Sequence, residues 1–393
     1  MNSRDIVLLA TADWDNPFWT NKQHVAVELA RRGNRVLYID SLGLRRPSVS
    51  GRDLKRILTR LRRAFLAPRE VRPGLWVWSP LIIPLQTTFS GRLNLWLLER
   101  RLDARLRALR MRREWLWTYN PLSSRLLSLP SFDRCIYHCV DDIAAQPGMP
   151  VALLKAAEVE LTRASDIVFT TSHALTESRR RCNDRTYYLP NVADYDHFSS
   201  ALSPSIALPQ DLGRISEPRI GFIGAISGYK VDFSLIRDMA CARPDWSIVL
   251  IGRVGEGDPW TDIGELRGLP NIHLLGPRPY AELPAYLKGF NVAMLPNQIN
   301  AYTDAMFPMK VFEYLASGCP IVSVNLKALV EYSHVICIAE STAEFIRKTA
   351  SVLAGNAPPL SARLAVAKQH TYATRTHRML SLIEQLPLSR RAL

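Results

Sequence analysis

The chain has 393 residues, of which 47% are hydrophobic and 22% charged, with a formal net charge of +14 at pH 7. This balance is typical of a globular protein with a substantial core, and the length predicts two domains of ordinary size. A membrane-spanning helix is excluded because Pro80 and Pro84 break the longest apolar run, residues 75–85, well short of the roughly 20 residues that a span requires.

The N-terminal residues predict a strand–helix–strand unit. Acidic residues at positions 5 and 13 interrupt the order of basic, apolar and small residues that a signal peptide shows, so we expect a cytoplasmic protein. Residues 6–11 predict a strand, 21–32 a helix and 35–40 a second strand. Such a unit predicts a parallel sheet. The intervening loop lacks G-x-G-x-x-G, which argues against a dinucleotide pocket.

Most of the positive charge lies in residues 41–115, which hold 18 Lys and Arg against five acids, a net charge of +13. Within this basic insertion, residues 54–65 place apolar side chains at helical spacing opposite lysines and arginines. Such a helix suits an anionic membrane surface, where each cation contributes about 1 kcal/mol. It equally suits a core-packing helix with a solvated basic face. Nucleic acid is less favoured, since no recognised nucleic-acid motif accompanies the arginines.

Further strands are predicted at residues 75–78, 115–119, 135–140 and 167–171. His138 and Asp141 occupy the carboxyl end of the third of these. An imidazole titrates near pH 6.5 and a carboxylate binds hydroxyl groups, so both suit proton handling or hydroxyl binding. The alternative for each is a structural role, such as capping the next helix. We expect Asp141 or His138 to act in catalysis.

A stretch rich in Ser, Pro and Gly predicts the boundary between the domains. Residues 200–217 show no periodicity, as is typical of a linker. We therefore expect a first domain over 1–199 that contains the basic insertion, a second domain over 218–358, and a final helix in 359–393.

The second domain begins with a strand and a glycine turn that suit phosphate. Residues 219–226 predict a strand that leads into a turn, and Gly224 near its end lets backbone amides approach an anion closely. Lys230 follows the turn and adds a positive charge. Arg253, at the end of the strand predicted over 247–253, offers a second cation or is a plain surface arginine.

Residues 300–322 organise the second domain. The sequence predicts a polar loop, a helix that opens at Pro308, and an apolar strand from residue 321. Lys310 and Glu313 share one helix face at a spacing of three residues, either as a surface pair or as ligand-binding groups. Ligand binding is favoured because the helix starts at the strand-end rim where open α/β sheets bind their ligands.

Residues 303–322, TDAMFPMKVFEYLASGCPIV, resemble the donor-nucleotide segment of GT-B glycosyltransferases, particularly the retaining family-four group. The matching positions are Pro308, Lys310, Glu313, Ala316, Gly318 and Pro320. The resemblance implies that Glu313 binds the ribose hydroxyls of a sugar nucleotide, and that the preceding loop, with Thr303 and Phe307, holds the diphosphate and donor sugar. One position departs from the pattern, because Ala305 stands where many members carry a second acidic residue.

The resemblance spans most of residues 158–355, including residues 158–172 and 187–198, and is thinner before residue 158. It also implies that the final helix, in residues 359–393, crosses back to the first domain. It implies that Lys230 clamps the diphosphate, while Ala225 or Ile226 occupies the position of the family's accompanying arginine; Arg253 could replace that charge. It also makes the first loop a candidate acceptor site. The acceptor candidates are Asn16, Trp19 and Asn21. Tryptophans near a strand end often cap a core instead.

Together these observations predict an α/β protein of GT-B architecture, with two Rossmann-like domains whose parallel sheets face a central cleft. The expected function is transfer of a sugar from a nucleotide-sugar donor to an acceptor hydroxyl, retaining by resemblance, in cell-surface polysaccharide or glycolipid assembly. We expect a glycan or lipid-linked acceptor, and a cytoplasmic location that could be peripheral at the inner face of the membrane.

No cofactor or metal is expected, because basic residues would stabilise the leaving diphosphate. The six cysteines include no C-x-x-C pair, which favours reduced thiols over disulfides or zinc. Two alternatives stay open: a sugar-nucleotide epimerase or hydrolase of the same fold, and a non-catalytic nucleotide-sugar-binding module.

Overall fold

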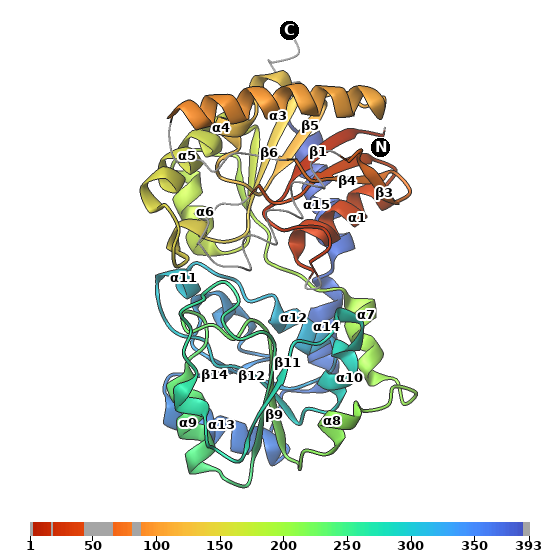
Figure 1. The fold of residues 1–393 in the computed structure, drawn as a ribbon. Helices are drawn as coiled ribbons and strands as arrows, with labels where there is room; N and C mark the ends of the chain where they lie inside the picture. Colours follow the sequence, from red (N-terminus) through yellow and green to blue (C-terminus); the bar gives the residue numbers. More distant parts are fainter. Residues whose placement is uncertain (1–2, 17–18, 43–65, 81–87, 388–393) are drawn as a thin grey trace. The chain divides into compact units, whose positions relative to one another are not determined.

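The computed structural model of the chain describes residues 3–16, 19–42, 66–80 and 88–387 (Figure 1). The chain divides into two compact units, Met1–Pro190 with Thr376–Leu393, and Asn191–Arg375. Each unit contains one sheet of its own. The basic helix predicted over residues 54–65 lies outside the described residues.

The first unit is built on an eight-stranded sheet with the order β3-β4-β2-β1-β5-β6-β7-β8. Its strands are β1 Asp5–Leu9, β2 Arg35–Ile39, β3 Arg69–Arg72, β4 Leu75–Trp78, β5 Trp115–Thr118, β6 Arg134–Cys139, β7 Ile167–Thr170 and β8 Thr186–Tyr188. All neighbours pair in parallel except β3, which runs antiparallel to β4. The sequence did not predict β3, because its charged residues suit a solvated edge strand and carry no apolar pattern.

Helices connect the strands of this sheet. They are α1 Asn21–Arg31, α3 Thr88–Ala108, α4 Ser123–Leu126, α5 Val151–Ala164 and α6 His173–Arg180, with the 3-10 turns η1 Leu129–Ser131 and η2 Ile143–Ala145. Helix α1 starts where the sequence predicted, because Thr20 and Gln23 form a capping box that pairs otherwise unsatisfied amides. Helix α3, the long orange helix in Figure 1, buries Asn94, Leu98, Leu102 and Leu106 on one face.

The second unit is built on a six-stranded parallel sheet with the order β11-β10-β9-β12-β13-β14. Its strands are β9 Arg219–Ile223, β10 Ser247–Ile251, β11 Ile272–Gly276, β12 Val292–Leu295, β13 Ile321–Val324 and β14 Cys337–Ala339. The central strands are continuous apolar runs, as expected for a sheet that is covered on both faces. The parallel sheet predicted for each half of the chain is therefore present.

The helices of the second unit follow its strands. They are α7 Tyr195–Ser199, α8 Gln210–Gly213, α9 Phe233–Ala242, α10 Leu283–Lys288, α11 Ala301–Asp304, α12 Lys310–Ala316, α13 Thr342–Leu353 and α14 Leu360–Gln369, with η3 Ser200–Leu202, η4 Gly264–Leu266, η5 Tyr280–Glu282 and η6 Lys327–Tyr332. Helices α9 and α13 lie side by side on one face of the sheet (Figure 1). None of the helices in the described ranges combines the length and hydropathy that a membrane crossing requires.

Two boundaries differ from the sequence prediction. Residues 200–217 belong to the second unit rather than to a linker, because Leu212 and Ile215 are buried in its core. The final helix is divided into α14 and α15 (Tyr372–Glu384). It breaks because Thr371 forms a β-bridge with Ala193, whose amide donates to the His370 carbonyl at 3.1 Å. Residues 376–393 belong to the first unit.

Candidate functional site

The predicted donor-binding residues lie at one edge of the second sheet. Strand β9 stands between β10 and β12, so the chain leaves it on one side and later returns on the other. Such a reversal of strand order is where open α/β sheets bind ligands, beyond the carboxyl ends of the strands. The loops that follow β9, β10 and β12 carry Gly224, Lys230, Arg253, Thr303 and Phe307.

Glycines let the ends of β9 and β10 approach each other closely. The Gly224 amide donates to the Ile251 carbonyl at 2.9 Å. Gly252 has φ +152°, and a Cβ built on it would lie 1.7 Å from the Gly224 oxygen. Only glycine fits at position 252, so the sequence fixes the backbone at the site where the predicted phosphate turn begins.

The loop after β9 is fastened to the loop after β12. The Lys230 carbonyl accepts hydrogen bonds from the Gln298 amide at 2.9 Å and from Asn297 Nδ2 at 3.1 Å. Asn300 Nδ2 donates to the Tyr229 carbonyl at 2.8 Å. These three bonds fix the backbone on both sides of the predicted diphosphate lysine.

Glu313 on α12 is buried and pairs with the half-buried Lys310. Lys310 Nζ lies 2.9 Å from Glu313 Oε2, and the Glu313 residue is only 4% exposed. This burial argues against the solvated surface pair that the spacing also allowed. Two hydrogen-bonding carboxylate oxygens at a sheet edge suit the binding of adjacent sugar hydroxyls.

Helix α12 begins at Lys310 and not at Pro308, which corrects the predicted start. Pro308 instead belongs to the turn before the helix, where its carbonyl accepts from the Val311 amide at 3.3 Å. Phe307 is buried and stacks on Phe312 with ring centroids 5.4 Å apart. Its carbonyl accepts from Asn191 Nδ2 at 2.6 Å, so the ring and backbone of Phe307 both anchor the start of α12.

The polar residues of the preceding loop cap a helix. Thr303 and Asn300 form a capping box at the start of α11, and the Thr303 hydroxyl donates to the Gln298 carbonyl at 2.6 Å. Asp304 forms an ion pair with Lys327 at 2.6 Å. The donor role of Thr303 stays a prediction, while its hydroxyl has a structural use.

Arg253 is exposed and lies one residue beyond Gly252 at the same sheet edge. Its carbonyl accepts a hydrogen bond from the Ile226 amide at 3.1 Å, which fastens its backbone to the turn after β9. Arg253 therefore stands beside the predicted phosphate turn, and its part in binding the diphosphate stays a prediction.

The catalytic candidates lie in the first unit. His138 is a residue of β6 and is fully buried against Trp117, Tyr119 and Phe169, with ring centroids 4.7 to 6.2 Å away. This enclosure suits a core residue. Asp141 follows the strand and is half-buried, and its carbonyl accepts from the Ile143 amide at 3.1 Å. Catalytic roles for both residues stay predictions.

A buried polar cluster that the sequence did not reveal lies beside them. Tyr137 donates a hydrogen bond to Glu158 at 2.5 Å, and Arg179 forms an ion pair with the same carboxylate at 2.7 Å. Burial raises the pKa of the Cys139 thiol to about 12, which keeps it protonated. The cluster therefore holds α5 and α6 to the end of β6.

The acceptor candidates lie around the loop after β1. The amide of Asn16 donates to the Asp13 carbonyl at 3.1 Å. Trp19 is half-buried, with its ring 5.1 Å from Trp14, and Asn21 is buried as the first residue of α1. The structure gives Trp19 and Asn21 a packing role, and their contact with an acceptor stays a prediction.

Within the parts of the chain that the structure describes, no group of three or more His, Cys, Asp and Glu side chains is placed to hold a metal ion.

Comparison with known proteins shows what the second unit is similar to. Residues 217–355 match the family model of the glycosyl transferases group 1. The chain is also 31% identical over 225 residues to the putative teichuronic acid biosynthesis glycosyltransferase TuaH of Bacillus subtilis (strain 168). That match covers 54% of this chain and 55% of TuaH, so it spans about half the length of the relative.

Solved structures show that the fold over nearly the whole chain is of the GT-B class. Sucrose-phosphate synthase from Thermosynechococcus elongatus matches with a TM-score of 0.68 and 16% identity, covering 98% of this chain and 99% of that one. HepE from Anabaena, in complex with UDP, matches with a TM-score of 0.65 and 15% identity, covering 98% of this chain and 100% of that one. At this identity the likeness shows the fold, and the predicted GT-B class is confirmed.

Proposed function

We propose that the chain is a glycosyltransferase that moves a sugar from a nucleotide-sugar donor to an acceptor hydroxyl. The observation that carries the proposal is the buried Glu313 carboxylate, which is paired with Lys310 at the carboxyl edge of the sheet, within the residues that match the group 1 family model. A carboxylate so held can accept hydrogen bonds from both ribose hydroxyls. UDP-sugars are the first donors to test, because the structurally similar HepE was solved with UDP and with UDP-glucose.

The chemistry proposed for this site is electrostatic. Cleavage of the donor leaves a diphosphate on which negative charge develops, and cations fixed beforehand stabilise that charge by several kcal/mol. Lys230 and Arg253 are the cations in the loops beside the glycine turn. We propose that they take this part without a metal ion, so that EDTA leaves the rate of transfer unchanged. A rate that falls with EDTA and returns with added Mg²⁺ would contradict this.

A donor screen tests the assignment of Glu313. Thermal unfolding is measured with UDP-, GDP-, ADP- and dTDP-sugars, because a ligand bound by the native state raises stability, and a tighter ligand raises it more. We expect one nucleotide to raise the unfolding temperature, and Glu313→Gln to weaken its binding roughly tenfold or more through lost charged hydrogen bonds. The matched control is Glu344→Gln, since Glu344 forms an ion pair at the same spacing on α13.

Nucleotide affinity, measured together with product release, separates the alternatives. Unchanged nucleotide affinity in Glu313→Gln contradicts the ribose assignment. Release of free sugar at a rate independent of any acceptor favours an epimerase or hydrolase, and binding without turnover over the whole donor set favours a binding module. We propose retention of the anomeric configuration, which proton NMR of the product checks directly.

We also propose a glycan or lipid-linked acceptor at an anionic membrane surface, in cell-surface polysaccharide or glycolipid assembly. The support lies in the basic insertion, of which α3 is the described helix. Trp96 on α3 is 52% exposed and lies under the Arg100 guanidinium at 5.0 Å. The acids Glu99 and Asp103 of this helix both pair with Arg113. An exposed tryptophan beside arginines suits the interface of an anionic bilayer.

Vesicle sedimentation tests the membrane proposal. We expect the full chain to bind phosphatidylglycerol vesicles and not phosphatidylcholine vesicles, and we expect Trp96→Ala with Arg100→Glu to weaken binding about tenfold or more. Trp260→Ala is the matched control, because Trp260 is an exposed tryptophan of the second unit. Equal binding of both vesicle types, or of variant and wild type, contradicts the proposal.

A further inference from the structure

The side chain of Lys230 rests on two tyrosine rings. Its ammonium nitrogen lies 5.1 Å from the ring centroid of Tyr229 and 5.4 Å from that of Tyr302. The two rings meet edge to face, with centroids 5.1 Å apart. Both distances are within the range of about 6 Å in which a cation is attracted to the face of an aromatic ring.

The rings are held firmly. Tyr302 is 4% exposed and belongs to α11, which starts with the Asn300 capping box. Asn300 also donates to the Tyr229 carbonyl at 2.8 Å, so one residue fixes the backbone that carries both rings. The Lys230 backbone is tied to the same loop through its carbonyl. The two tyrosines therefore form a rigid support beneath a flexible side chain.

The charge of Lys230 is available for an anion. Over the described ranges of the chain, the structure gives its ammonium no hydrogen bond and no ion pair, only the two ring contacts. Lys310, by contrast, is engaged with Glu313 at 2.9 Å. Contact with a ring face leaves the three N–H donors of an ammonium free to bind oxygen atoms.

We propose that Tyr302 and Tyr229 hold the Lys230 ammonium in place for the diphosphate of the donor. Tyr302 is a positioning residue, because it acts on the ligand through Lys230. The proposal rests on the nucleotide-sugar function proposed above. It assigns the task of fixing this cation to two tyrosines, one next to Lys230 in the sequence and the other 72 residues away.

Preorganisation explains why such a support matters here. A free lysine side chain loses rotational freedom when it binds, and a side chain that is already fixed loses less. Ala225 and Ile226 leave the glycine turn without a cation of its own, so the diphosphate depends strongly on Lys230. Removing one ring should weaken diphosphate binding by roughly three- to thirtyfold, the range that a cation–π contact supplies.

Isothermal calorimetry on the full chain tests the proposal with UDP, uridine and inorganic pyrophosphate. We expect Tyr302→Leu to weaken UDP and pyrophosphate binding by that factor and to leave uridine binding within about twofold, while Tyr302→Phe restores wild-type values because the ring is kept. In a Lys230→Met background, Tyr302→Leu should have no further effect, since the two residues act through one contact. Arg243→Met is the matched control, because Arg243 lies over Trp246 before the amino end of β10.

The outcomes separate this proposal from the proposed function. A folded Tyr302→Leu protein that binds UDP as tightly as wild type overturns the inference and leaves the donor assignment standing. Equal losses of affinity for UDP and for uridine also overturn the inference, because they indicate a general disturbance of the loop. Pyrophosphate binding that depends on Tyr302, without binding of UDP or uridine, supports the inference and contradicts a uridine donor. A wild type that binds none of the three overturns both.

Discussion

Asp40 is a buried carboxyl group at the end of β2. It is 5% exposed and accepts hydrogen bonds from the Trp14 amide at 2.7 Å and from the Ser79 hydroxyl. Burial raises the pKa of Asp40 to about 6, against the lowering effect of these two hydrogen bonds. Nothing in the spacing of the sequence distinguished this aspartate from other residues that end a strand.

We expect Asp40→Asn to change how stability depends on pH. Between about pH 4 and pH 6 the native state keeps a proton that the unfolded chain releases, so the free energy of unfolding of wild type falls as the pH rises through this window. Asparagine does not ionise, so the variant has no cost of burying a charged carboxylate. At pH 7.5 the variant should therefore be more stable than wild type by roughly 1–3 kcal/mol, and this difference should disappear towards pH 4. Urea unfolding at several pH values measures this.

The exposed Asp184→Asn is the control in the same unit. We expect it to keep the wild-type pH profile. A pH-independent difference between Asp40→Asn and wild type would contradict the raised pKa.

At the scale of elements, α14 is fastened to the end of α12 by a buried arginine. Arg363 Nε donates to the Pro358 carbonyl at 3.0 Å, and its Nη1 donates to the Gly318 carbonyl just beyond α12. Gly318 has φ +78°, which glycine adopts freely and which ends the helix. The helix that carries Lys310 and Glu313 is thus stopped by a glycine and held from outside by Arg363.

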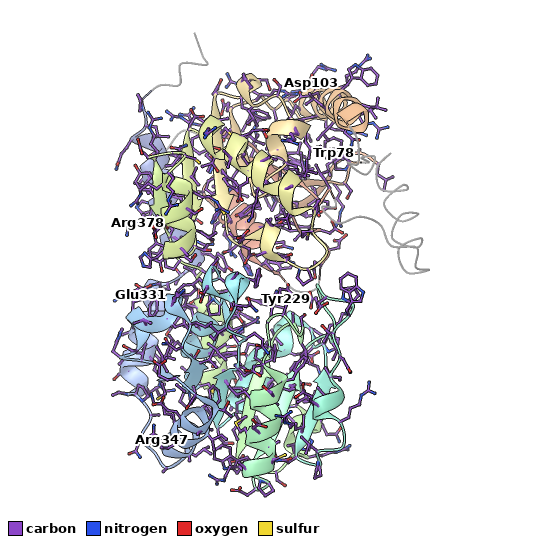
Figure 2. The ribbon with its side chains drawn as sticks, turned by 90° about the vertical axis from the view of Figure 1, so that its left-hand side faces the viewer. Trp78, Asp103, Tyr229, Glu331, Arg347 and Arg378 are labelled. Carbon is purple, nitrogen blue, oxygen red and sulfur yellow. The ribbon has the colours of Figure 1, made fainter. Side chains whose placement is uncertain are left out.

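We expect Arg363→Met to lower the free energy of unfolding of the second unit by roughly 1–3 kcal/mol, because two partly buried carbonyls lose their hydrogen-bond donor. Arg347→Met is the matched control. Arg347 is 73% exposed on α13 and lies well away from Tyr229 in Figure 2. Its replacement should change stability by less than about 0.5 kcal/mol. Chemical denaturation followed by circular dichroism compares them, and equal stabilities of the two variants would refute a role for Arg363.

At the scale of the whole molecule, the first unit is completed by the end of the chain. Residues 376–393 belong to it, and Met379, Leu380 and Ile383 of α15 are buried. Arg134 also donates to the Leu386 carbonyl at 3.1 Å. The second unit, in contrast, is one continuous segment, Asn191–Arg375.

Removal of residues 376–393 should therefore destabilise the first unit and spare the second. Loss of three buried apolar side chains costs roughly 1.5–3 kcal/mol each. Tryptophan fluorescence reports mainly on the first unit, which holds seven of the nine tryptophans. We expect the unfolding transition seen by fluorescence to shift to a lower urea concentration. UDP should still stabilise the second unit, whose own unfolding transition is unaffected by the truncation. Coincident shifts of both transitions would contradict independent units.

Most of the fold was predictable because its signals are local. The strands β4, β5 and β7 are short apolar runs bounded by polar residues. The capping residues of α1, Thr20 and Gln23, lie at its N-terminus in the sequence. The errors occurred where distant contacts override local pattern. The sequence pattern of residues 200–217 is that of a linker, but Leu212 is buried in the core of the second unit. The last helix is continuous by its pattern, but the pairing of Ala193 with Thr371 divides it.

The sequence by itself determined the alternation of strands and helices and the Lys310–Glu313 pair, because each depends on residues close together in the chain. Tertiary structure decided the rest. The enclosure of His138 by aromatic rings, the raised pKa of Asp40 and the support of Lys230 by Tyr302 all join residues far apart in sequence. Burial and cation–π attraction depend on distance in space, and no spacing along the chain encodes that distance.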